Sequence, residues 1–359
     1  MEREGRNLIS TAVVMFWMVN LCNAGLDLTY VDPTTEFAIA ANSGRQSEPA
    51  IWGDWVAWCE RRGTDGGYDI YAENLSTNEE IKLTGPSSSA ASYPDIYDGL
   101  VVWNDWRNGD SDIYQYDLRT RTESILYSGP GEQVWPAIYG DTVVWAYRDS
   151  MPGVPEEVWG YSISEDEAFL ISDSEGYKWY PDISGDIVVW GDFRNGNWDI
   201  YGYDLSAHTE LEIASGPEYQ RSAAVHGDRV AYEHGNQGIG IYDLDSGTRM
   251  IHESQGANDN IAIYGEIIVW GSMRGGRGPD TDRTYNIYGY NAVGDEEFPI
   301  CVSPGDQGGP AIYENIVVWS DGRLGGWWEA DIYGNTVVPE PASILLVSFG
   351  GLVLLRKRS

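Results

Sequence analysis

The sequence predicts an all-β protein, a seven-bladed β-propeller built of four-stranded antiparallel blades. A short apolar run that ends in an aromatic residue recurs seven times, and most copies continue with a Gly-rich turn and Asp-Ile-Tyr or a close variant. A repeat of about 40–45 residues with several short strands is typical of a propeller blade. The aromatic residues that end the runs are Trp58, Trp103, Trp145, Trp190, Tyr232, Trp270 and Trp319.

The first strand of each unit, strand A, is predicted at a Pro-x-Ile segment. Five units carry this segment, and units 5 and 6 replace it with Ala223–Val225 and Ile261–Ile263. Most copies then have Gly-Asp, as in Gly185-Asp186. Glycine supplies the positive φ that a tight hairpin turn needs, so strand A is predicted to turn directly into strand B.

Strands B, C and D follow from hydrophobic patterning. Strand B is the β-branched run that ends in the aromatic residue, which predicts a strand buried on both faces. Strand C alternates apolar and polar residues, as in Asp112–Leu118. Strand D is predicted as an outer, edge-like segment in units 1 to 6, for example Thr209–Ser215.

The seventh unit has no strand D of its own. It breaks off after Ala330–Asn335, whereas the segment Thr34–Asn42 ahead of unit 1 is similar to the strand D of unit 4. The N-terminal segment is therefore predicted to complete blade 7 and to close the ring, which removes two exposed sheet edges.

Both ends of the chain are predicted to be targeting segments. Residues 1–24 have basic residues, an apolar run and small residues before a cleavage point after Ala24, as in a signal peptide. Residues 25–338 are predicted to form the propeller. In residues 339–359, Pro339-Glu340-Pro341 precedes an apolar stretch and Arg356–Arg358. That stretch would rise about 21 Å as a helix, which also fits a C-terminal core helix, but the terminal cations favour a membrane-anchored tail.

Composition excludes some partners. The formal net charge of −34 repels nucleic acid and anionic lipid, so no nucleic-acid binding is expected. Cys22 falls in the predicted signal peptide. Cys59 and Cys301 lack the neighbours of a metal site or an activated thiol and are expected to be buried, with a disulfide left open.

These motifs resemble known families. The order Pro-x-Ile, β-run, Asp-x-Arg-x-Gly, Asp-Ile-Tyr and strand D resembles TolB-type propeller repeats and, more closely, surface-layer-type propeller repeats, over residues 34–335. The C-terminal order resembles a PEP-CTERM sorting tail. That resemblance implies export in a Gram-negative bacterium, transient anchoring in the inner membrane, processing by an exosortase-type enzyme near Pro339–Pro341, and a final place at the cell surface or in the extracellular matrix.

Repeated charged residues follow strand B in several units. A feature shared by most blades is expected to hold the turn together through ion pairs and Asx-type hydrogen bonds, so a structural role is predicted. No metal site and no cofactor are predicted, although the oxygen-rich turn Asn104–Asp112 leaves Ca²⁺ open. The repeated residues are Asp105, Arg107, Asp192, Arg194, Asp321 and Arg323.

No catalytic residue is predicted. The four histidines have no partner at metal-ligand spacing, and no nucleophile motif is present. Some propeller polysaccharide lyases use His-ligated manganese, which makes His226 and His234 the residues to inspect for the enzymatic alternative.

Aromatic residues in the D–A and B–C connections are the candidate ligand-binding residues. Both connections emerge on one rim of an up-and-down blade, and the B–C connections differ in length between units. Variable loops on a rigid scaffold commonly carry binding sites, and aromatic rings suit a sugar or a peptide. Packing across the blade tops is the alternative for Tyr93, Trp135 and Tyr180. The candidates are Tyr93, Trp106, Trp135, Trp179, Tyr180, Trp198, Trp327 and Trp328.

Together these patterns predict an exported, non-catalytic binding scaffold for an extracellular polysaccharide or an envelope protein. The alternatives are a propeller enzyme of the polysaccharide lyase or glycosidase class, which needs one blade unlike the others, and a purely architectural surface protein, in which all loop aromatics would be packed.

Overall fold

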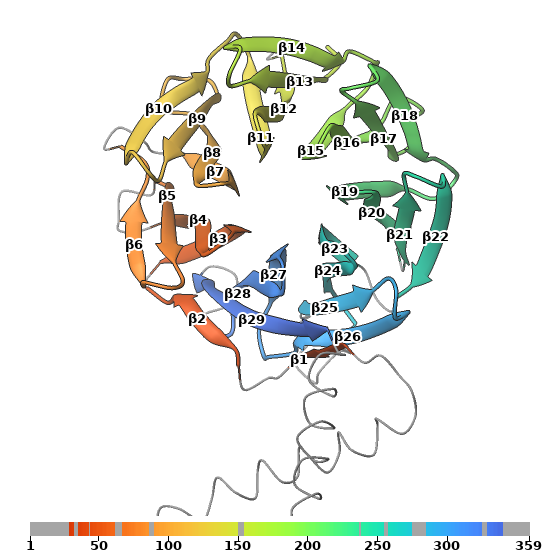
Figure 1. Ribbon diagram of the computed structural model, residues 1–359. Helices are drawn as coiled ribbons and strands as arrows, with labels where there is room; N and C mark the ends of the chain where they lie inside the picture. The colour runs from red at the N-terminus through yellow and green to blue at the C-terminus, as the bar shows by residue number, and fades with distance from the viewer. Residues whose placement is uncertain are drawn as a thin grey trace, which may run out of the picture.

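The computed structural model is a closed ring of seven antiparallel sheets with four strands per blade and one extra short strand in blade 7, which confirms the predicted seven-bladed propeller (Figure 1). It describes residues 29–31, 35–42, 44–61, 67–85, 90–149, 154–236, 238–254, 258–274, 285–324 and 329–339. In blades 1 to 6, strands that follow one another pair with one another, so each of these blades is a meander. The first strand of each blade points toward the centre of the ring, and the last forms its outer edge.

The strand positions A to D, named from the centre outward, recur in all blades from 1 to 7. Strands A are β3 (Arg45–Trp52), β7 (Ala91–Tyr97), β11 (Glu132–Tyr139), β15 (Lys178–Ser184), β19 (Gln220–His226), β23 (Asn258–Tyr264) and β27 (Gln307–Tyr313). Strands B are β4 (Trp55–Arg61), β8 (Leu100–Asp105), β12 (Thr142–Arg148), β16 (Ile187–Asp192), β20 (Arg229–His234), β24 (Ile267–Ser272) and β28 (Ile316–Asp321). Strands C are β5 (Asp69–Asn74), β9 (Asp112–Asp117), β13 (Glu157–Ser162), β17 (Asp199–Asp204), β21 (Gly238–Asp243), β25 (Asn286–Asn291) and β29 (Asp331–Pro339). Strands D are β6 (Glu79–Lys82), β10 (Thr122–Tyr127), β14 (Glu167–Ser172), β18 (Thr209–Ala214), β22 (Thr248–Glu253), β26 (Glu296–Cys301) and β2 (Phe37–Ala40).

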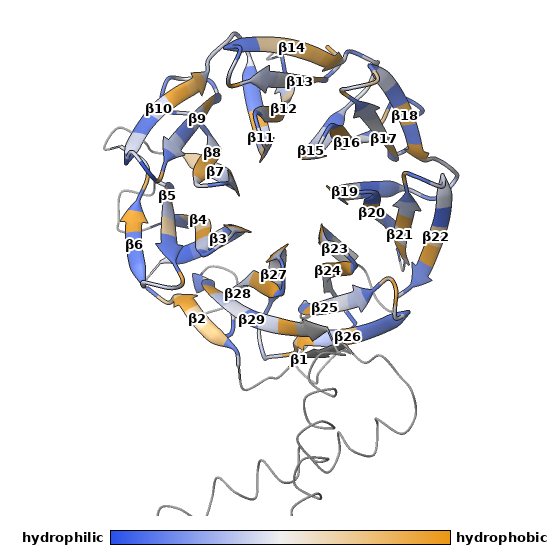
Figure 2. Cartoon of the chain, in the orientation of Figure 1, coloured by the Kyte–Doolittle hydropathy of each residue, from blue (hydrophilic) through white to orange (hydrophobic). Residues whose placement is uncertain are grey.

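Strand B is the buried centre of each blade, as the apolar runs predict. Val188, Val189 and Trp190 of β16 have no exposed surface, and all seven strand-B aromatic residues are at most 1% exposed. Outer strands are more polar: β22 is almost entirely exposed and largely hydrophilic (Figure 2). The burial gradient along each blade therefore runs from strand B outward to strand D.

The prediction for strand A was too short. The structure starts β7 at Ala91, three residues before Pro94, and shifts the register against β8 between Ser92 and Asp95. Tyr93 lies in this β-bulge with φ of 55°. A bulge interrupts the alternation that marks a strand in the sequence, which is why the sequence wrongly predicts connecting loops for Tyr93, Trp135, Trp179 and Tyr180.

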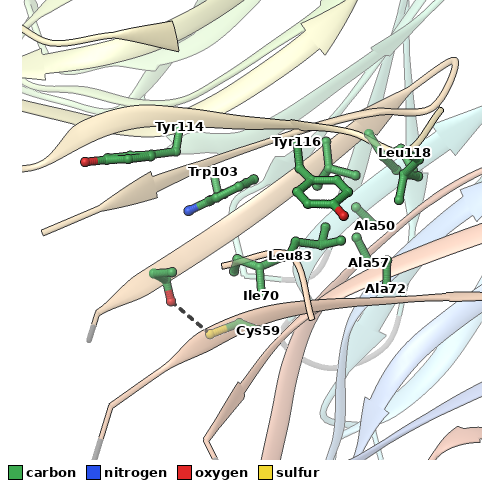
Figure 3. Packing of buried hydrophobic residues seen from close by; sticks show 13 residues of the cluster. Ala50, Ala57, Cys59, Ile70, Ala72, Leu83, Trp103, Tyr114, Tyr116 and Leu118 are labelled. Carbon is green, nitrogen blue, oxygen red and sulfur yellow. Dashed lines mark hydrogen bonds between the residues drawn. The ribbon is translucent and has the colours of Figure 1, made fainter. Parts of the chain in front are cut away.

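The core is divided into seven hydrophobic clusters, one at each interface between neighbouring blades. Figure 3 shows the interface between blades 1 and 2, where Trp103 and Tyr116 pack toward Leu83 and Ile70. The Cys59 thiol donates to the carbonyl oxygen of Ala91 across this interface, at 3.2 Å. Close packing between adjacent sheets, repeated around the ring, is what makes the propeller one rigid scaffold.

The N-terminal segment closes the ring, as predicted. β2 pairs antiparallel with β29 and becomes the strand D of blade 7 (Figure 1). Ile39 and Ala40 of β2 are buried in the cluster that joins blade 7 to blade 1. The short strand β1 (Thr29–Val31) adds to the last residues of β29 and extends this closure.

Cys59 and Cys301 are both buried and free. Burial raises the pKa of both thiols, that of Cys301 to about 12, so neither is an activated nucleophile at neutral pH. In the part of the chain that the structure describes, no helix is long and apolar enough to span a membrane. The predicted signal peptide and Glu340–Pro341 of the sorting motif lie outside the described residues.

Candidate functional site

One residue in each strand A adopts positive φ, directly before the Pro-x-Ile position. These seven residues surround the mouth of the central channel. The left-handed conformation suits Gly or Asn and is strained for larger side chains, and such strain tends to collect at functional positions. The seven residues are Glu48, Tyr93, Trp135, Tyr180, Ser222, Asn260 and Gly309, with φ between 48° and 58°.

The seven blades place different side chains at this equivalent position. Blades 2, 3 and 4 carry aromatic rings, blades 5, 6 and 7 carry Ser, Asn and Gly, and blade 1 carries Glu48. Gly309 satisfies the backbone without strain, so the backbone alone does not explain the large rings in blades 2 to 4. The mouth of the channel is therefore chemically asymmetric although its backbone is nearly seven-fold.

The rings of blades 2 to 4 form a continuous cluster, which we call the aromatic arc: Tyr93, Trp135, Trp179, Tyr180 and Trp198. The ring centroids of Trp135 and Tyr180 are 4.4 Å apart, and those of Trp179 and Trp198 are 4.1 Å apart. Tyr93 contacts both Trp135 and Tyr180, with centroids 6.3 and 6.2 Å away. Tilted and edge-on contacts of this kind stabilise aromatic pairs.

The arc is packed but remains accessible. Tyr180 is 39% exposed, and the other four side chains are partly exposed. Arg148 covers part of Trp135, with its guanidinium carbon 4.0 Å above the ring, and is held by Glu156. The arc thus offers ring faces and edges on the rim where strands A begin and strands B end.

The arc is extended by two further aromatic residues, which were not among the candidates predicted from the sequence. Phe193 lies 5.2 Å from Trp198, and Tyr177, 56% exposed, lies 6.2 Å from Phe193. Trp106 lies just after β8 at the same rim and is 37% exposed, outside the arc. Trp327 and Trp328 lie outside the described residues.

The repeated Asp and Arg residues fix the B–C turns. In blade 4, the Asp192 carboxylate accepts hydrogen bonds from Trp190 Nε1 at 2.9 Å, from the Arg194 backbone amide at 2.9 Å and from Arg194 Nη2 at 2.7 Å. Burial raises the pKa of this carboxyl, but the donors outweigh it and the pKa is lowered overall. Asp192 therefore stays ionised and ties the turn to the buried tryptophan.

The arginine of this motif reaches on to strand D. Arg194 also binds Glu210 at 2.7 Å and lies 3.8 Å above the Tyr201 ring. Blades 2 and 7 repeat the arrangement: Asp105 and Arg107 with Glu123, and Asp321 and Arg323 with Glu36. The sequence does not reveal the glutamate partners, because each arginine lies in a B–C turn whereas its glutamate lies on strand D or directly ahead of it.

The central channel below the mouth encloses a cavity of about 380 Å³. Its wall is formed by the seven strands A and is mostly apolar, with Pro, Ala and Ile in most blades. Blades 2 and 4 place Asp95 and Asp182 where the other five have alanine. Each carboxylate accepts a hydrogen bond from a backbone amide of the next blade, Ile138 and Val225 respectively, both at 2.8 Å.

Burial raises the pKa of both channel carboxyls, to about 6 for Asp95 and about 7 for Asp182. The backbone amides oppose this, and the Asp95 charge further raises the pKa of Asp182. Both residues are only partly buried and line the cavity. The channel wall is thus poorly suited to two uncompensated negative charges.

The far end of the channel is lined by a second group of rings, which we call the aromatic floor. It comprises the last strand-A residue of six blades, and Ser184 interrupts it in blade 4. A second cavity of about 370 Å³ opens beside this interruption, lined by Ser184, Asp186 and His226 among others. Five pairs of neighbouring floor rings have centroids 4.1 to 5.2 Å apart. The floor residues are Trp52, Tyr97, Tyr139, His226, Tyr264 and Tyr313.

The sequence carried a signal for the floor, because an aromatic residue follows Pro-x-Ile in most units. A second repeated signal lies three residues before the proline position. There Gln133, Gln220 and Gln307 donate to carbonyl oxygens of their own D–A connections, and Lys178 donates to Ser174 O in blade 4. These side chains hold the start of strand A in position.

The histidines do not gather at one site. His226 lies at the floor, where burial lowers its pKa and Nδ1 accepts from the Gly265 amide at 3.0 Å. His234 lies at the opposite end of the β19–β20 hairpin, roughly 16 Å of strand away. His252 pairs with Glu297 on the outer strands. Among the described residues, no group of three or more His, Cys, Asp or Glu side chains could hold a metal ion.

The turn Asn104–Asp112, which left calcium open, is occupied by protein donors. Arg107 binds Asp105, and Asn108 Nδ2 donates to Asp112 Oδ2 at 2.9 Å. These contacts hold the shape of the turn at the rim.

No family model matches the chain, and no curated protein sequence matches it. Solved structures are similar in fold. TolB from Acinetobacter baumannii is 16% identical with a TM-score of 0.54, over 73% of this chain and 67% of TolB. Oligogalacturonate lyase from Vibrio parahaemolyticus is 14% identical with a TM-score of 0.65, over 88% of this chain and 97% of the lyase.

A third similar structure is the β-propeller domain of the Trilobed protease from Pyrococcus furiosus, which has an open velcro topology. It is 16% identical with a TM-score of 0.63, over 83% of this chain and 94% of that domain. At these identities the similarity describes the fold, and the three proteins carry different names. The chain therefore has a TolB-like seven-bladed β-propeller fold.

Proposed function

We propose that this chain is an exported, surface-associated propeller that binds an extracellular polysaccharide and has no catalytic activity of its own. The observation that carries the proposal is the aromatic arc at the mouth of the channel. Only blades 2 to 4 place rings at the strained strand-A position, and those rings join Trp179 and Trp198 in one partly exposed surface.

Sugars suit this surface because the C–H faces of a sugar ring pack on aromatic rings while its hydroxyl groups remain hydrated. The arc lies on a rigid scaffold, so little conformational entropy is lost when a ligand binds. Exposure of Tyr180 and Tyr177 favours a binding role over the purely architectural alternative, which expects the rim rings to be packed away from solvent.

Export is part of the same proposal. The signal-peptide pattern in residues 1–24 and the sorting pattern in residues 339–359 support passage across the inner membrane and processing by an exosortase-type enzyme. A surface with a formal charge near −34 also suits an extracellular location and disfavours polyanionic partners.

A glycan array tests the proposal. We expect the double variant Trp179→Ala/Trp198→Ala to lose at least tenfold in retention, since two stacked rings each contribute about 1 kcal/mol or more to packing with a ligand. The single variant Tyr180→Ala, which removes an exposed ring, is expected to lose retention with little change in melting temperature.

Trp106→Ala is the matched control, because Trp106 is a rim tryptophan outside the arc. Full retention by the double variant, or an equal loss in Trp106→Ala, would contradict the assignment. If the array retains nothing and a pull-down from the organism's matrix recovers an envelope protein, the protein ligand replaces the polysaccharide.

A further inference from the structure

The cavity directly beneath the aromatic arc is lined by aromatic rings and carboxylates as well as by apolar side chains. It measures about 380 Å³, within the size range of small-ligand sites, and it opens at the mouth formed by the seven positive-φ residues. Tyr93, Trp135 and Tyr180 line this opening, so a ligand on the arc has direct access to the cavity.

Aromatic rings lie at both ends of the cavity. The arc borders the entrance, and the aromatic floor lines the far end, with Trp52 4.1 Å from Tyr97 and 4.7 Å from Tyr313 between ring centroids. The faces of aromatic rings are negative and attract cations, most strongly where water is largely excluded.

Charged residues in the cavity wall carry one sign. Among the described residues, the wall contains the carboxylates Glu48, Asp95 and Asp182 and no Lys or Arg. Burial raises the pKa of Asp95 and Asp182, and a cation placed between them would lower both again. The cavity therefore favours a positive group and disfavours an anionic one.

We propose that the channel receives a primary ammonium group carried by an amino sugar of the polysaccharide that binds to the aromatic arc. The inference rests on the proposed function and adds the class of sugar. The sugar ring packs on Tyr180 and Trp135 at the mouth. Its ammonium group points inward, where the negative charges of Asp95 and Asp182 attract it and it approaches the aromatic floor.

Titration calorimetry with three hexamers at pH 7 tests this. The probes are a glucosamine hexamer, its N-acetylated counterpart and a galacturonate hexamer, each added to the full chain. We expect the glucosamine hexamer to bind at least tenfold more tightly than the acetylated one, and the galacturonate hexamer to give no heat.

The double variant Asp95→Asn/Asp182→Asn separates the channel from the general negative charge of the surface. It should lose at least tenfold in affinity for the glucosamine hexamer and keep its affinity for the acetylated one. Asp98→Asn is the matched control, because it removes a carboxylate from an exposed A–B turn outside the cavity and is expected to leave both affinities unchanged.

Two results would overturn the inference and leave the proposed function standing. One is equal affinity for both glucosamine-based hexamers, with both lost in Trp179→Ala/Trp198→Ala. The other is a loss of glucosamine binding in Asp98→Asn as large as that in the channel variant, which indicates attraction to the acidic surface alone. Failure of the proposed function is seen separately, as glycan-array retention that the arc variants do not change.

Discussion

Individual carboxylates have opposite roles in the blades and in the channel. Asp192 accepts three hydrogen bonds from Trp190 and Arg194 and remains ionised, so its charge is compensated within the turn. Asp182 has only backbone amides as partners and borders a cavity without cations among the described residues. Turn carboxylates like Asp192 recur in several blades and stabilise the scaffold. Channel carboxylates like Asp182 occur only in blades 2 and 4.

The pH dependence of stability should report on Asp182. Its pKa in the folded chain is about 7, against about 4 when unfolded, so between these values the folded state binds more protons than the unfolded state. The free energy of unfolding therefore falls as pH rises from 4 to 7 and stays lower above 7. Asp182→Asn removes this penalty, and we expect the stability advantage of the variant over the parent to be about 1 kcal/mol larger at pH 8 than at pH 5.

Urea unfolding of parent and variant at pH 5 and pH 8 measures this difference. The expected gain is smaller than the roughly 4 kcal/mol that the whole change in pKa would give, because the channel keeps Asp182 partly solvated. The same stability difference at both pH values would show that Asp182 titrates normally.

Some of these side chains could be predicted from the sequence and others could not. Asp192 and Arg194 repeat at fixed spacing along the chain, so their pairing was predictable. Glu210 joins them from strand D, and a single sequence does not reveal which strand D carboxylate meets which arginine. Asp95 and Asp182 occupy an alanine position in the other blades, which is a visible departure, but only the closed ring shows that this position borders a cavity.

The closing strand β2 is equivalent to β18, the strand D of blade 4. Residues 35–40 follow the pattern of residues 209–214, and both strands show the same register shift against their strand C partner. Glu36 binds Arg323 just as Glu210 binds Arg194. The Phe37 ring packs over Gly334, where a side chain would collide with it.

Equivalent substitutions in the two strands test whether closure is as stabilising as an internal blade. Ile39 is buried between blades 7 and 1, and Ile213 occupies the same place between blades 4 and 5. We expect Ile39→Ala and Ile213→Ala each to lower the free energy of unfolding by about 2–4 kcal/mol. A neutral Ile39→Ala beside a destabilising Ile213→Ala would mean that β2 does not close the ring in solution.

Strand existence and order were predictable, because hydrophobic runs and Gly-containing turns recur. Strand A was the exception. Its bulge at Tyr93 and the equivalent positions breaks the period of two, so the N-terminal half of the strand looks like a loop in the sequence. The N-terminal halves of these strands carry four of the five rings of the aromatic arc. Because the sequence predicts loops there, it does not show that a strand holds these rings in place.

Over the whole molecule, near-identical blades are combined with an asymmetric channel mouth. Seven interblade clusters fix the ring, and aromatic residues at the strained position are confined to blades 2, 3 and 4. Repetition in the sequence predicted the scaffold. The arc could be predicted only as a set of candidate rings, since it depends on which blades become neighbours and on which rim each ring emerges.

Hydroxyl-radical footprinting of the full chain, alone and with the best-retained glycan of the array, shows directly whether the aromatic arc is the surface that binds the glycan. We predict that oxidation falls at least severalfold at Tyr93, Trp135, Trp179, Tyr180 and Trp198. It should stay unchanged at Met250 and Val293, which are exposed on other parts of the molecule. Protection of the outer strands or of the aromatic floor, with the arc still fully oxidised, would contradict the account.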